Sequence, residues 1–325
     1  MRQIKYVEAE NEALREEMKR DPDLVLMGED IGKAWQGAFK VTKGLQEEFG
    51  PERVRDTPIS EAAIVGCAVG ASLTGLRVVA EIMFGDLLSL AMDQICNQAA
   101  KIHYMFGGQA TVPIVVRTNF GAAGNYGAHH SQSLEAWFVH IPGLIVIQPS
   151  TPYDAKGLLK SAIRNPNPVM FFEHKFLYNT TGDVPEQEYL VPIGKADVKR
   201  EGRNVTIIAT SLMVLKALKA AEELQKEGIS AEIVDPRTLR PLDRKTIADS
   251  VKKTGRVLIV HEACGFGGIS GELTKVIVED AFDYLDAPPL TLAGKDAPVP
   301  VEPRMEQYNV PNEAQIIQAV KKLIK

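Results

Sequence analysis

Short apolar runs alternate along this chain with segments of helical periodicity. Expected strands are "LVLMG" (24–28), "RVVAEIM" (77–83), "PIVVRT" (113–118), "LIVIQP" (144–149) and "PVMFFE" (168–173). Helices are expected between them, at 4–20, 60–75, 86–101, 131–139 and 153–164. Strands that are apolar at consecutive positions are buried on both faces, which is typical of a parallel sheet covered by helices. The sequence therefore predicts an α/β fold.

The stretch "NTTGDVPEQEYLVPIGKADVKREGR" (179–203) breaks this alternation, because it is polar, contains two prolines and has no sustained periodicity. Strand patterns resume after it at 205–210, 230–235 and 256–262. A chain of 325 residues is long enough for two separate cores. We therefore expect two domains, each a mostly parallel sheet covered by helices, at 1–180 and 204–325, with a linker at 181–203.

Charge and composition exclude several classes of function. The formal net charge is -5 and no Lys/Arg-rich run occurs, which argues against nucleic acid or an anionic membrane as the main partner. The first twenty residues are charged throughout, and no run of eighteen uncharged apolar residues occurs, so a cytoplasmic protein is expected. Cys67, Cys96 and Cys264 lie far apart in apolar or Gly-rich settings and are expected to be buried, reduced thiols.

Glu61 is the only charged residue in "TPISEAAIVGCAVGASLTG" (57–75), a segment expected to form a helix that is apolar on every face and therefore buried. Its structural interpretation is a first-turn carboxylate favoured by the helix dipole, with Thr57 or Ser60 capping the helix. Its functional interpretation is a desolvated carboxyl group that keeps its proton to higher pH and serves in catalysis. The residues alone leave both interpretations open.

Two further motifs have alternative interpretations. In "CGFGGISGEL", Gly265 and Gly267 imitate a dinucleotide fingerprint, but Ser270 stands where the third glycine is expected, which favours a tight turn with close packing. His129 and His130 lie in the Gly-rich loop "GNYGAHHSQS" beyond an expected parallel strand, where open α/β sheets bind ligands. Adjacent side chains diverge, so a shared metal is not expected. Ligand contact by one histidine and simple solvent exposure remain open.

Several long motifs resemble one known family. They are "DTPISEAAIVGCAVGASLTGLRVVAEIMFGD", "AMDQICNQAAKIHYMFGG", "HHSQSLEAWFVHIPGLIVIQPSTPYDAKGLLKSAIRNPNPVMFFE" and "DPRTLRPLD". Together they are similar to the β subunit of the thiamine-diphosphate-dependent first component of 2-oxo acid dehydrogenase complexes, of the pyruvate, acetoin or branched-chain type. The resemblance covers essentially the whole chain. It implies a transketolase-like pyrimidine-binding domain at 1–180 and a transketolase-type C-terminal domain at 204–325 that pairs subunits and docks partners.

The resemblance also implies roles for individual residues. Glu61 is expected to hydrogen-bond the ring nitrogen of the cofactor's aminopyrimidine, which explains a single carboxylate at the mouth of an apolar helix. His130 is expected to act on the 2-oxo acid and in acyl transfer to lipoyl groups. Glu29, Ile59 and Leu87 are expected to contact the cofactor. Many relatives carry an aromatic residue that stacks on the pyrimidine where this chain has Leu87, so ring stacking is lost here.

Metal sites follow from the same resemblance. A structural potassium site is implied at Ile114, Ala162, Ile163, Asn165 and Asn167, and the alternative is that this stretch is an Asn/Pro turn. Enzymes that bind thiamine diphosphate hold its Mg²⁺ with Gly-Asp-Gly followed by Asn, and no Gly-Asp-Gly occurs here. The resemblance therefore implies an α subunit that holds the diphosphate and Mg²⁺, in an α₂β₂ heterotetramer.

The expected reaction is decarboxylation of a 2-oxo acid, pyruvate first, with acyl transfer to the lipoyl domain of an acyltransferase component. Acetoin and branched-chain substrates remain open, as do a non-catalytic scaffolding subunit and an NAD-binding oxidoreductase. In "VIVEDAFDYLDAPP" the four acids form an expected acidic face, either simply solvated or able to steer a basic domain of the acyltransferase. These acids are Glu279, Asp280, Asp283 and Asp286.

Overall fold

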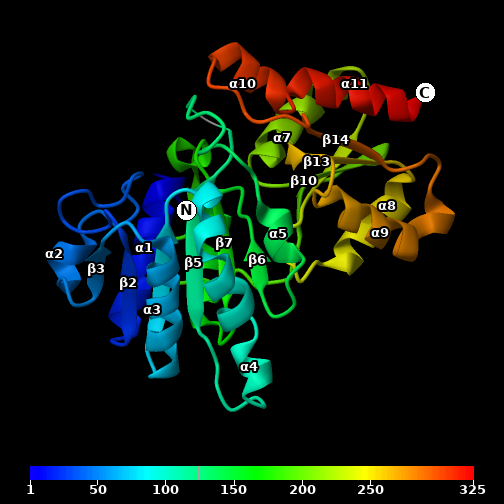
Figure 1. The fold of residues 1–325 in the computed structure, drawn as a ribbon. Coiled ribbons are helices and arrows are strands. Elements are labelled where there is room, and N and C mark those ends of the chain that lie inside the picture. Colours follow the sequence, from blue (N-terminus) through cyan, green and yellow to red (C-terminus); the bar gives the residue numbers. More distant parts are fainter. Residues whose placement is uncertain (123) are drawn as a thin grey trace. The chain divides into compact units, whose positions relative to one another are not determined.

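The computed structural model describes residues 1–122 and 124–325, which form two compact units (Figure 1). The first unit comprises Met1–Phe120 and Trp137–Ile193. The second comprises Gly121–Ala136 and Gly194–Lys325. The segment 121–136 therefore groups with the C-terminal part of the chain, although the chain on either side of it belongs to the first unit.

A parallel sheet forms the core of the first unit, with its strands in the order β6, β7, β5, β4, β2, β3. Their bounds are β2 (Leu24–Glu29), β3 (Val54–Thr57), β4 (Arg77–Ile82), β5 (Ile114–Phe120), β6 (Ile145–Ile147) and β7 (Val169–His174). Every residue of β5 and β7 is buried, as expected for strands covered on both faces. The α/β prediction is confirmed.

Helices cover this sheet, and a separate antiparallel pair joins β1 (Arg2–Lys5) to β8 (Thr181–Val184). The helices are α1 (Tyr6–Arg20), α2 (Leu45–Phe49), α3 (Glu61–Leu73), α4 (Ile102–Met105), α6 (Pro152–Arg164) and a 3₁₀ turn (Leu177–Asn179), while α5 (Glu135–Val139) spans the passage from the second unit. Helix α6 begins where Thr151 Oγ1 accepts a hydrogen bond from the Asp154 N–H at 3.1 Å, with Pro152 in the first turn.

Three expected helices differ in the structure. The helix expected over 4–20 begins only at Tyr6, because residues 4 and 5 belong to β1, which pairs with β8. The helix expected near 131–139 is confined to Glu135–Val139. The segment 86–101 is not one α-helix but a 3₁₀ helix (Gly85–Ala91) followed by a π-helical turn (Gln94–Ala99). The Ser89 hydroxyl donates to the Asp86 carbonyl at 3.0 Å, three residues back, which favours the tighter winding.

The prediction that α3 is buried on every face is wrong. One side of the helix, including Ile64, Val65 and Ala68, is buried against β4 and the 3₁₀ helix. The other side, including Ala63 and Cys67, is exposed. An all-apolar helix does not indicate which of its faces meets the sheet, and this chain covers only one of them.

The prediction of buried thiols is wrong as well. Cys67 and Cys264 are exposed and Cys96 is half-buried, and all three are free. Burial, with the nearby Lys101 charge opposing it, raises the pKa of the Cys96 thiol. None of the three cysteines is therefore a fully buried core residue.

The second unit is built on a sheet with the strand order β14, β13, β10, β11, β9, in which only β9 is antiparallel to its neighbour. The strands are β9 (Asp197–Arg200), β10 (Val205–Ala209), β11 (Ala231–Asp235), β13 (Val257–Cys264) and β14 (Leu290–Gly294), and β12 (Thr238–Arg240) lies between β11 and β13 in the chain. The helices are α7 (Leu212–Lys226), α8 (Arg244–Thr254), α9 (Ser270–Ala281), α10 (Pro303–Asn309) and α11 (Glu313–Ile324), with a 3₁₀ turn at Phe282–Tyr284. Helix α11 packs on α7, and α8 packs on α9.

The glycine-rich turn after β13 serves close packing. A Cβ at Gly268 would lie 2.7 Å from the Cys264 carbonyl oxygen and 2.7 Å from the His261 ring, so only glycine fits there. Ser270 shares a hydrogen bond of 3.0 Å with His261 Nε2. Within the described residues, no helix has both the length and the apolar character needed to cross a membrane.

Candidate active site

The candidate site begins at one edge of the sheet in the first unit, where the neighbouring parallel strands β4, β2 and β3 end. Glu29 is the last residue of β2 and pairs with Thr57, the last residue of β3. Four residues after Thr57, Glu61 opens α3. Carboxyl ends of neighbouring parallel strands meet at one sheet edge, which is where open α/β folds bind ligands. The structure thus brings Glu29 and Glu61 together.

Glu61 is only 6% exposed, although it lies in the first turn of its helix. The capping expected for this helix is absent, since Ser60 makes no side-chain cap and the buried Thr57 hydroxyl has no hydrogen-bond partner within the described residues. The structural interpretation of Glu61 assumed that Thr57 or Ser60 caps the helix, and this cap is not formed. What remains is a buried carboxyl group at an uncapped helix N-terminus, where the helix dipole favours negative charge.

The pKa of Glu29 is raised, first by burial and then by the negative charges of Asp30, Glu61 and Asp56. Four acidic side chains thus gather at this edge, and none of the groups that shift the pKa of Glu29 is basic. Glu29 therefore retains its proton to higher pH than an isolated glutamate, so this edge favours chemistry in which a carboxyl group donates or shares a proton.

Ile59 and Leu87, the other two residues expected to contact the cofactor, are both apolar. Ile59, between Thr57 and Glu61, is 73% exposed, which is unusual for an isoleucine. Leu87 is half-buried in the 3₁₀ helix that follows β4, and its N–H donates to the Phe84 carbonyl at 2.9 Å.

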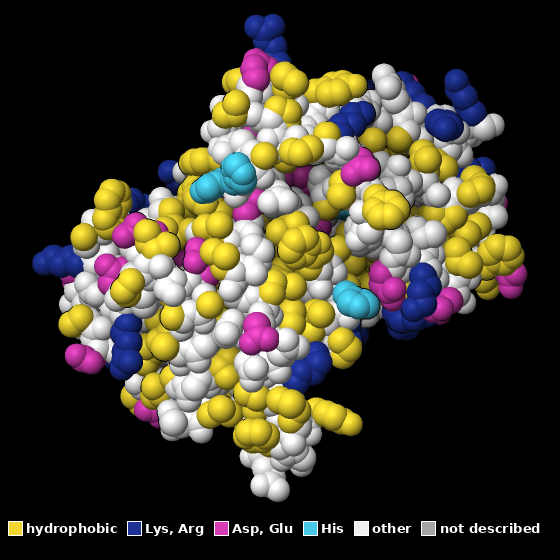
Figure 2. All heavy atoms as spheres, in the orientation of Figure 1, with side chains coloured by type: hydrophobic (Ala, Val, Ile, Leu, Met, Phe, Trp, Pro, Cys, Tyr) yellow, Lys and Arg dark blue, Asp and Glu magenta, His cyan; other side chains and the backbone are white. Residues whose placement is uncertain are grey.

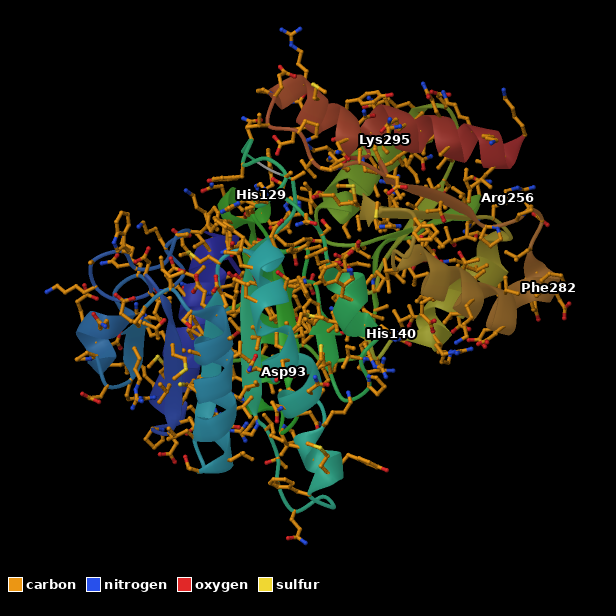
Figure 3. All side chains as sticks on the ribbon, viewed as in Figure 1. Asp93, His129, His140, Arg256, Phe282 and Lys295 are labelled. Carbon is orange, nitrogen blue, oxygen red and sulfur yellow. The ribbon has the colours of Figure 1, made fainter. Side chains whose placement is uncertain are left out.

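His129 and His130 belong to the second unit, on the segment 121–136. His129 is exposed (Figure 3), whereas His130 is half-buried, and the His130 N–H donates to the Gly127 carbonyl at 3.3 Å. The two histidines therefore have different environments. This difference is expected if one side chain faces a ligand and the other is solvated.

The five residues implied for potassium are gathered near the end of α6 and the start of β5. Here Arg77 Nη1 donates to the carbonyl oxygens of Ile163 at 2.9 Å and Asn165 at 3.2 Å. The Asn165 side-chain oxygen accepts from the Asn167 N–H at 2.9 Å, as in an Asn turn. Oxygen atoms therefore converge here, but two of them already accept hydrogen bonds from a guanidinium group. Arg77 was not expected at this position, because its contacts lie 86 and 88 residues along the chain.

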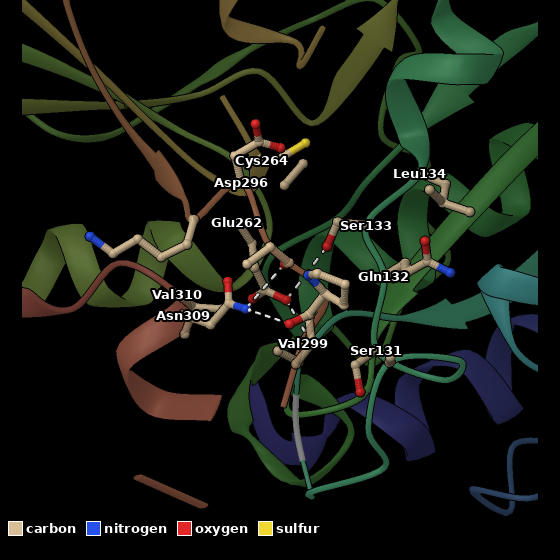
Figure 4. Close-up of a pocket in the computed structure, with 16 residues that line it drawn as sticks. Ser131, Gln132, Ser133, Leu134, Glu262, Cys264, Asp296, Val299, Asn309 and Val310 are labelled. Atoms are coloured by element: carbon tan, nitrogen blue, oxygen red, sulfur yellow. Dashed lines mark hydrogen bonds between the residues drawn. The ribbon is translucent and has the colours of Figure 1, made fainter. Parts of the chain in front are cut away.

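A second unforeseen feature is a cavity of about 300 Å³ in the second unit (Figure 4). It is lined by residues 131–134 on one side and by Glu262, Cys264 and residues 295–299 on the other. Glu262 Oε1 accepts hydrogen bonds from the Ala122 N–H at 2.5 Å and from Ser133 Oγ at 3.5 Å. Burial and then the Glu262 charge raise the pKa of Glu135 to about 7, although a backbone hydrogen bond opposes the shift.

In the described part of the chain, no three His, Cys, Asp or Glu side chains are grouped to hold a metal.

Comparisons with known proteins agree with this architecture. Residues 2–181 match the family described as "Transketolase, pyrimidine binding domain", and residues 194–316 match "Transketolase, C-terminal domain". The solved structure titled "Split gene transketolase, inactive beta4 tetramer" superposes with a TM-score of 0.81 over 99% of this chain and 98% of that chain. Its sequence identity is 24%, so it supports the fold alone.

Relatives of three kinds are similar over almost the whole chain. "Pyruvate dehydrogenase E1 component subunit beta" of Rhizobium meliloti is 48% identical over 97% of this chain and 68% of its own length. "2-oxoisovalerate dehydrogenase subunit beta" of Bacillus subtilis is 48% identical over 98% of both chains. "Acetoin:2,6-dichlorophenolindophenol oxidoreductase subunit beta" of Bacillus subtilis is 46% identical over 99% of this chain and 98% of its own length.

Proposed function

The chain belongs to the transketolase-like family of β subunits of 2-oxo acid dehydrogenase first components, and on that premise we propose that it supplies the pyrimidine half of a thiamine diphosphate site. The observation that carries the proposal is the buried Glu61 carboxyl group, adjacent to Glu29 at the sheet edge. The transketolase-like assignment supports thiamine diphosphate as the cofactor.

The residues at this edge fit the aminopyrimidine. Ile59 and Leu87 offer apolar surface to a flat ring, and Glu61 is the acid that can hydrogen-bond one of its nitrogens. Thiamine diphosphate, when bound, would supply a carbon nucleophile and would accept the electron pair that stays on the substrate carbon when CO₂ leaves. Glu61 shares a proton with the ring nitrogen, and burial keeps water from competing for that hydrogen bond. Glu29 lies beside it, and the Glu61 charge contributes to the raised pKa of Glu29.

His130 is proposed to serve the later half of the reaction. His130 is half-buried, and an imidazole can both transfer a proton and stabilise negative charge on an oxygen. In this proposal it acts on the 2-oxo acid and during acyl transfer to a lipoyl group. The difference in exposure between His129 and His130 supports the choice of His130.

We propose that an α subunit completes the site and holds the diphosphate and Mg²⁺, in an α₂β₂ heterotetramer. The lack of Gly-Asp-Gly in the chain supports this division. So do apolar side chains left on the surface, since large exposed apolar groups mark interaction sites. On and after α4, Tyr104, Met105 and Phe106 are each more than half exposed, and hydrophobic side chains gather over this helix in Figure 2.

The proposed substrate is pyruvate, and the acyl acceptor is the lipoyl domain of an acyltransferase component. Relatives of the pyruvate, branched-chain and acetoin types are almost equally similar, so the assay must include all three substrates. The acidic helix face expected at 279–286 is not formed, because α9 ends at Ala281 and a 3₁₀ turn follows at Phe282–Tyr284. Docking of a basic acyltransferase domain on these acids therefore receives less support. Arg244 pairs with Glu279 and Asp280 at 2.8 Å, and Arg256 with Asp286 at 3.0 Å, so much of that charge is already neutralised within the chain.

We also propose that K⁺ binds near Asn165. Main-chain and amide oxygens from Ile114, Ala162, Ile163, Asn165 and Asn167 are ligands of the kind that K⁺ prefers, although Arg77 already binds two of them. Thermal unfolding in KCl and NaCl at equal ionic strength tests this proposal. A higher Tm in KCl that is enlarged in Asn165→Asp supports the site, and equal Tm values in both salts for both proteins contradict it.

The decisive experiment compares the chain alone with the chain purified together with its α subunit. Calorimetry is expected to detect Mg²⁺-dependent binding of thiamine diphosphate by the complex and little or none by the chain alone. Micromolar Mg²⁺-dependent binding by the lone chain would contradict the shared site. Full activity of a Glu61→Gln complex would favour a scaffolding subunit, and saturable quenching of NADH fluorescence would favour a nicotinamide enzyme.

A further inference from the structure

The segment that carries His130 is a closed loop held by the second unit. Its ends meet where the Gly121 N–H donates to the Gln132 carbonyl at 3.3 Å, and His130 lies just before that closure. Between them, Gly121, Gly124, Asn125 and Gly127 all have positive φ. Asn125, at φ 62°, is the only one of these four that is not glycine, so its left-handed backbone is less favourable than that of the three glycines.

Glu306 supplies that stabilisation. This glutamate of α10 is 7% exposed, and both of its carboxylate oxygens accept from the Asn125 N–H, at 3.1 and 3.3 Å. A hydrogen bond to a charged acceptor is stronger than one between neutral groups. Because it lies at the left-handed residue, this contact fixes the turn where the loop conformation is least favourable.

Glu262 holds both ends of the same loop from the end of β13. Its Oε1 accepts from the Ala122 N–H at 2.5 Å and lies 3.5 Å from Ser133 Oγ, three residues beyond His130 (Figure 4). The cavity of about 300 Å³ lies between residues 131–134 and the 295–299 stretch, so apolar packing does not fill this side of the loop. The carboxylate contacts therefore determine the loop position to a greater degree than close packing does.

We propose that Glu306 and Glu262 are positioning residues that hold the 121–136 segment so that His130 meets the substrate in the correct geometry. This inference rests on the proposed role of His130. It assigns the C-terminal domain a part in catalysis beyond pairing subunits, since both glutamates come from that domain. A small displacement of a catalytic group lowers the rate strongly, because reacting groups must be aligned to within a fraction of an ångström.

The test uses the αβ complex and reductive acylation of a lipoyl domain. Glu306→Ala is expected to lower kcat about tenfold with little change in KM for the 2-oxo acid, because one hydrogen bond to a charged group is lost. Glu306→Gln keeps an acceptor oxygen and is expected to restore most of the rate. Glu302→Ala is the matched control, because Glu302 caps the same helix through the Met305 N–H at 2.9 Å and makes no hydrogen bond to the described residues of the loop. An equal loss of kcat in the control would overturn the inference.

A double-mutant cycle separates this inference from the proposed function. In a His130→Ala background, Glu306→Ala is expected to lower kcat less than about twofold further, because residues that act through one another are not additive. A full, additive loss would contradict positioning of His130. If His130→Ala alone leaves kcat unchanged, the proposed function of His130 fails instead. Hydrogen exchange at the Asn125 amide is expected to accelerate in Glu306→Ala and not in Glu302→Ala. Unchanged exchange at Asn125 would contradict the proposed role of Glu306 in holding the loop.

Discussion

The carboxyl group of Glu29 lies close enough to that of Glu61 for the negative charge of Glu61 to raise the pKa of Glu29. The relationship follows from strand register, because β2 ends at Glu29 directly opposite Thr57, and Glu61 begins the helix that follows. Two acids that repel each other at one sheet edge are unfavourable for stability. Such an arrangement is typical of functional sites, in which groups that the reaction needs lower the stability of the fold.

Glu61→Gln is expected to leave assembly with the α subunit intact and to lower decarboxylation about a hundredfold or more, since an amide cannot share an acidic proton. The rate with an artificial electron acceptor measures this effect. Glu47→Gln is a suitable control, because Glu47 is also an acid in the first turn of its helix, α2, but is exposed. A Glu61→Gln rate within a few-fold of wild type would return Glu61 to a purely structural role.

Glu29→Gln is expected to stabilise the isolated chain while lowering the activity of the complex. A carboxyl group whose pKa is raised on folding binds more protons in the folded than in the unfolded state, so stability falls as pH rises through its titration. Glutamine lacks this titration, so the Tm of the variant is expected to exceed that of wild type at pH 8 and to approach it at pH 4. Scanning calorimetry at both pH values decides, and a variant less stable at pH 8 would contradict the repulsion.

The alternating apolar runs were sufficient to predict the sheets, because a short run of consecutive apolar residues between turn residues, such as that of β7, is typical of a strand buried on both faces. They were not sufficient to predict which face of α3 is exposed, because apolar residues on all sides of a helix give no direction. Glu306 and Glu262 were also missed. They reach the His130 segment across 181 and 140 residues of sequence, and a single chain contains no signal for contacts at such separation.

Glu10→Gln is expected to stabilise the first unit at neutral and higher pH. Glu10 is fully buried, 3.8 Å from Arg117 Nη2, and burial together with the Glu173 charge raises its pKa well above the ordinary range. The stability contributed by the protonated form is present below the unfolded pKa near 4.5 and is lost as pH rises through the folded pKa. Glutamine mimics the protonated form at every pH, so its advantage grows from pH 4.5 upward.

Urea unfolding between pH 4 and pH 9 measures this advantage. Glu16→Gln, on the same helix, is the matched control, because the pKa of Glu16 is shifted in the opposite direction to that of Glu10. Despite partial burial, hydrogen bonds from Lys156 and Lys160 lower the pKa of Glu16, so its loss is expected to destabilise the protein at neutral pH. Parallel responses of the two variants would show that burial of Glu10 does not govern the effect.

His261 is expected to make the second unit sensitive to mild acid. It is fully buried on β13, and burial lowers its pKa from 6.5 to about 4. The unfolded chain takes up a proton at His261 below pH 6.5, whereas the folded chain does so only near pH 4. The unfolded state therefore binds more protons between these values, and stability falls as pH drops from about 6.5 to about 4, by about 3 kcal/mol in total.

The His261→Gln variant removes this titration while keeping a side chain able to hydrogen-bond Ser270. It is expected to be less stable than wild type at pH 7, because the packing of the ring against Gly268 is lost, but to lose less stability between pH 7 and pH 4.5. Hydrogen exchange of the β13 amides at both pH values reports on the second unit directly. Equal acid sensitivity of the two proteins would mean that His261 is not the group responsible, because a residue that does not titrate in the variant cannot produce the same pH dependence.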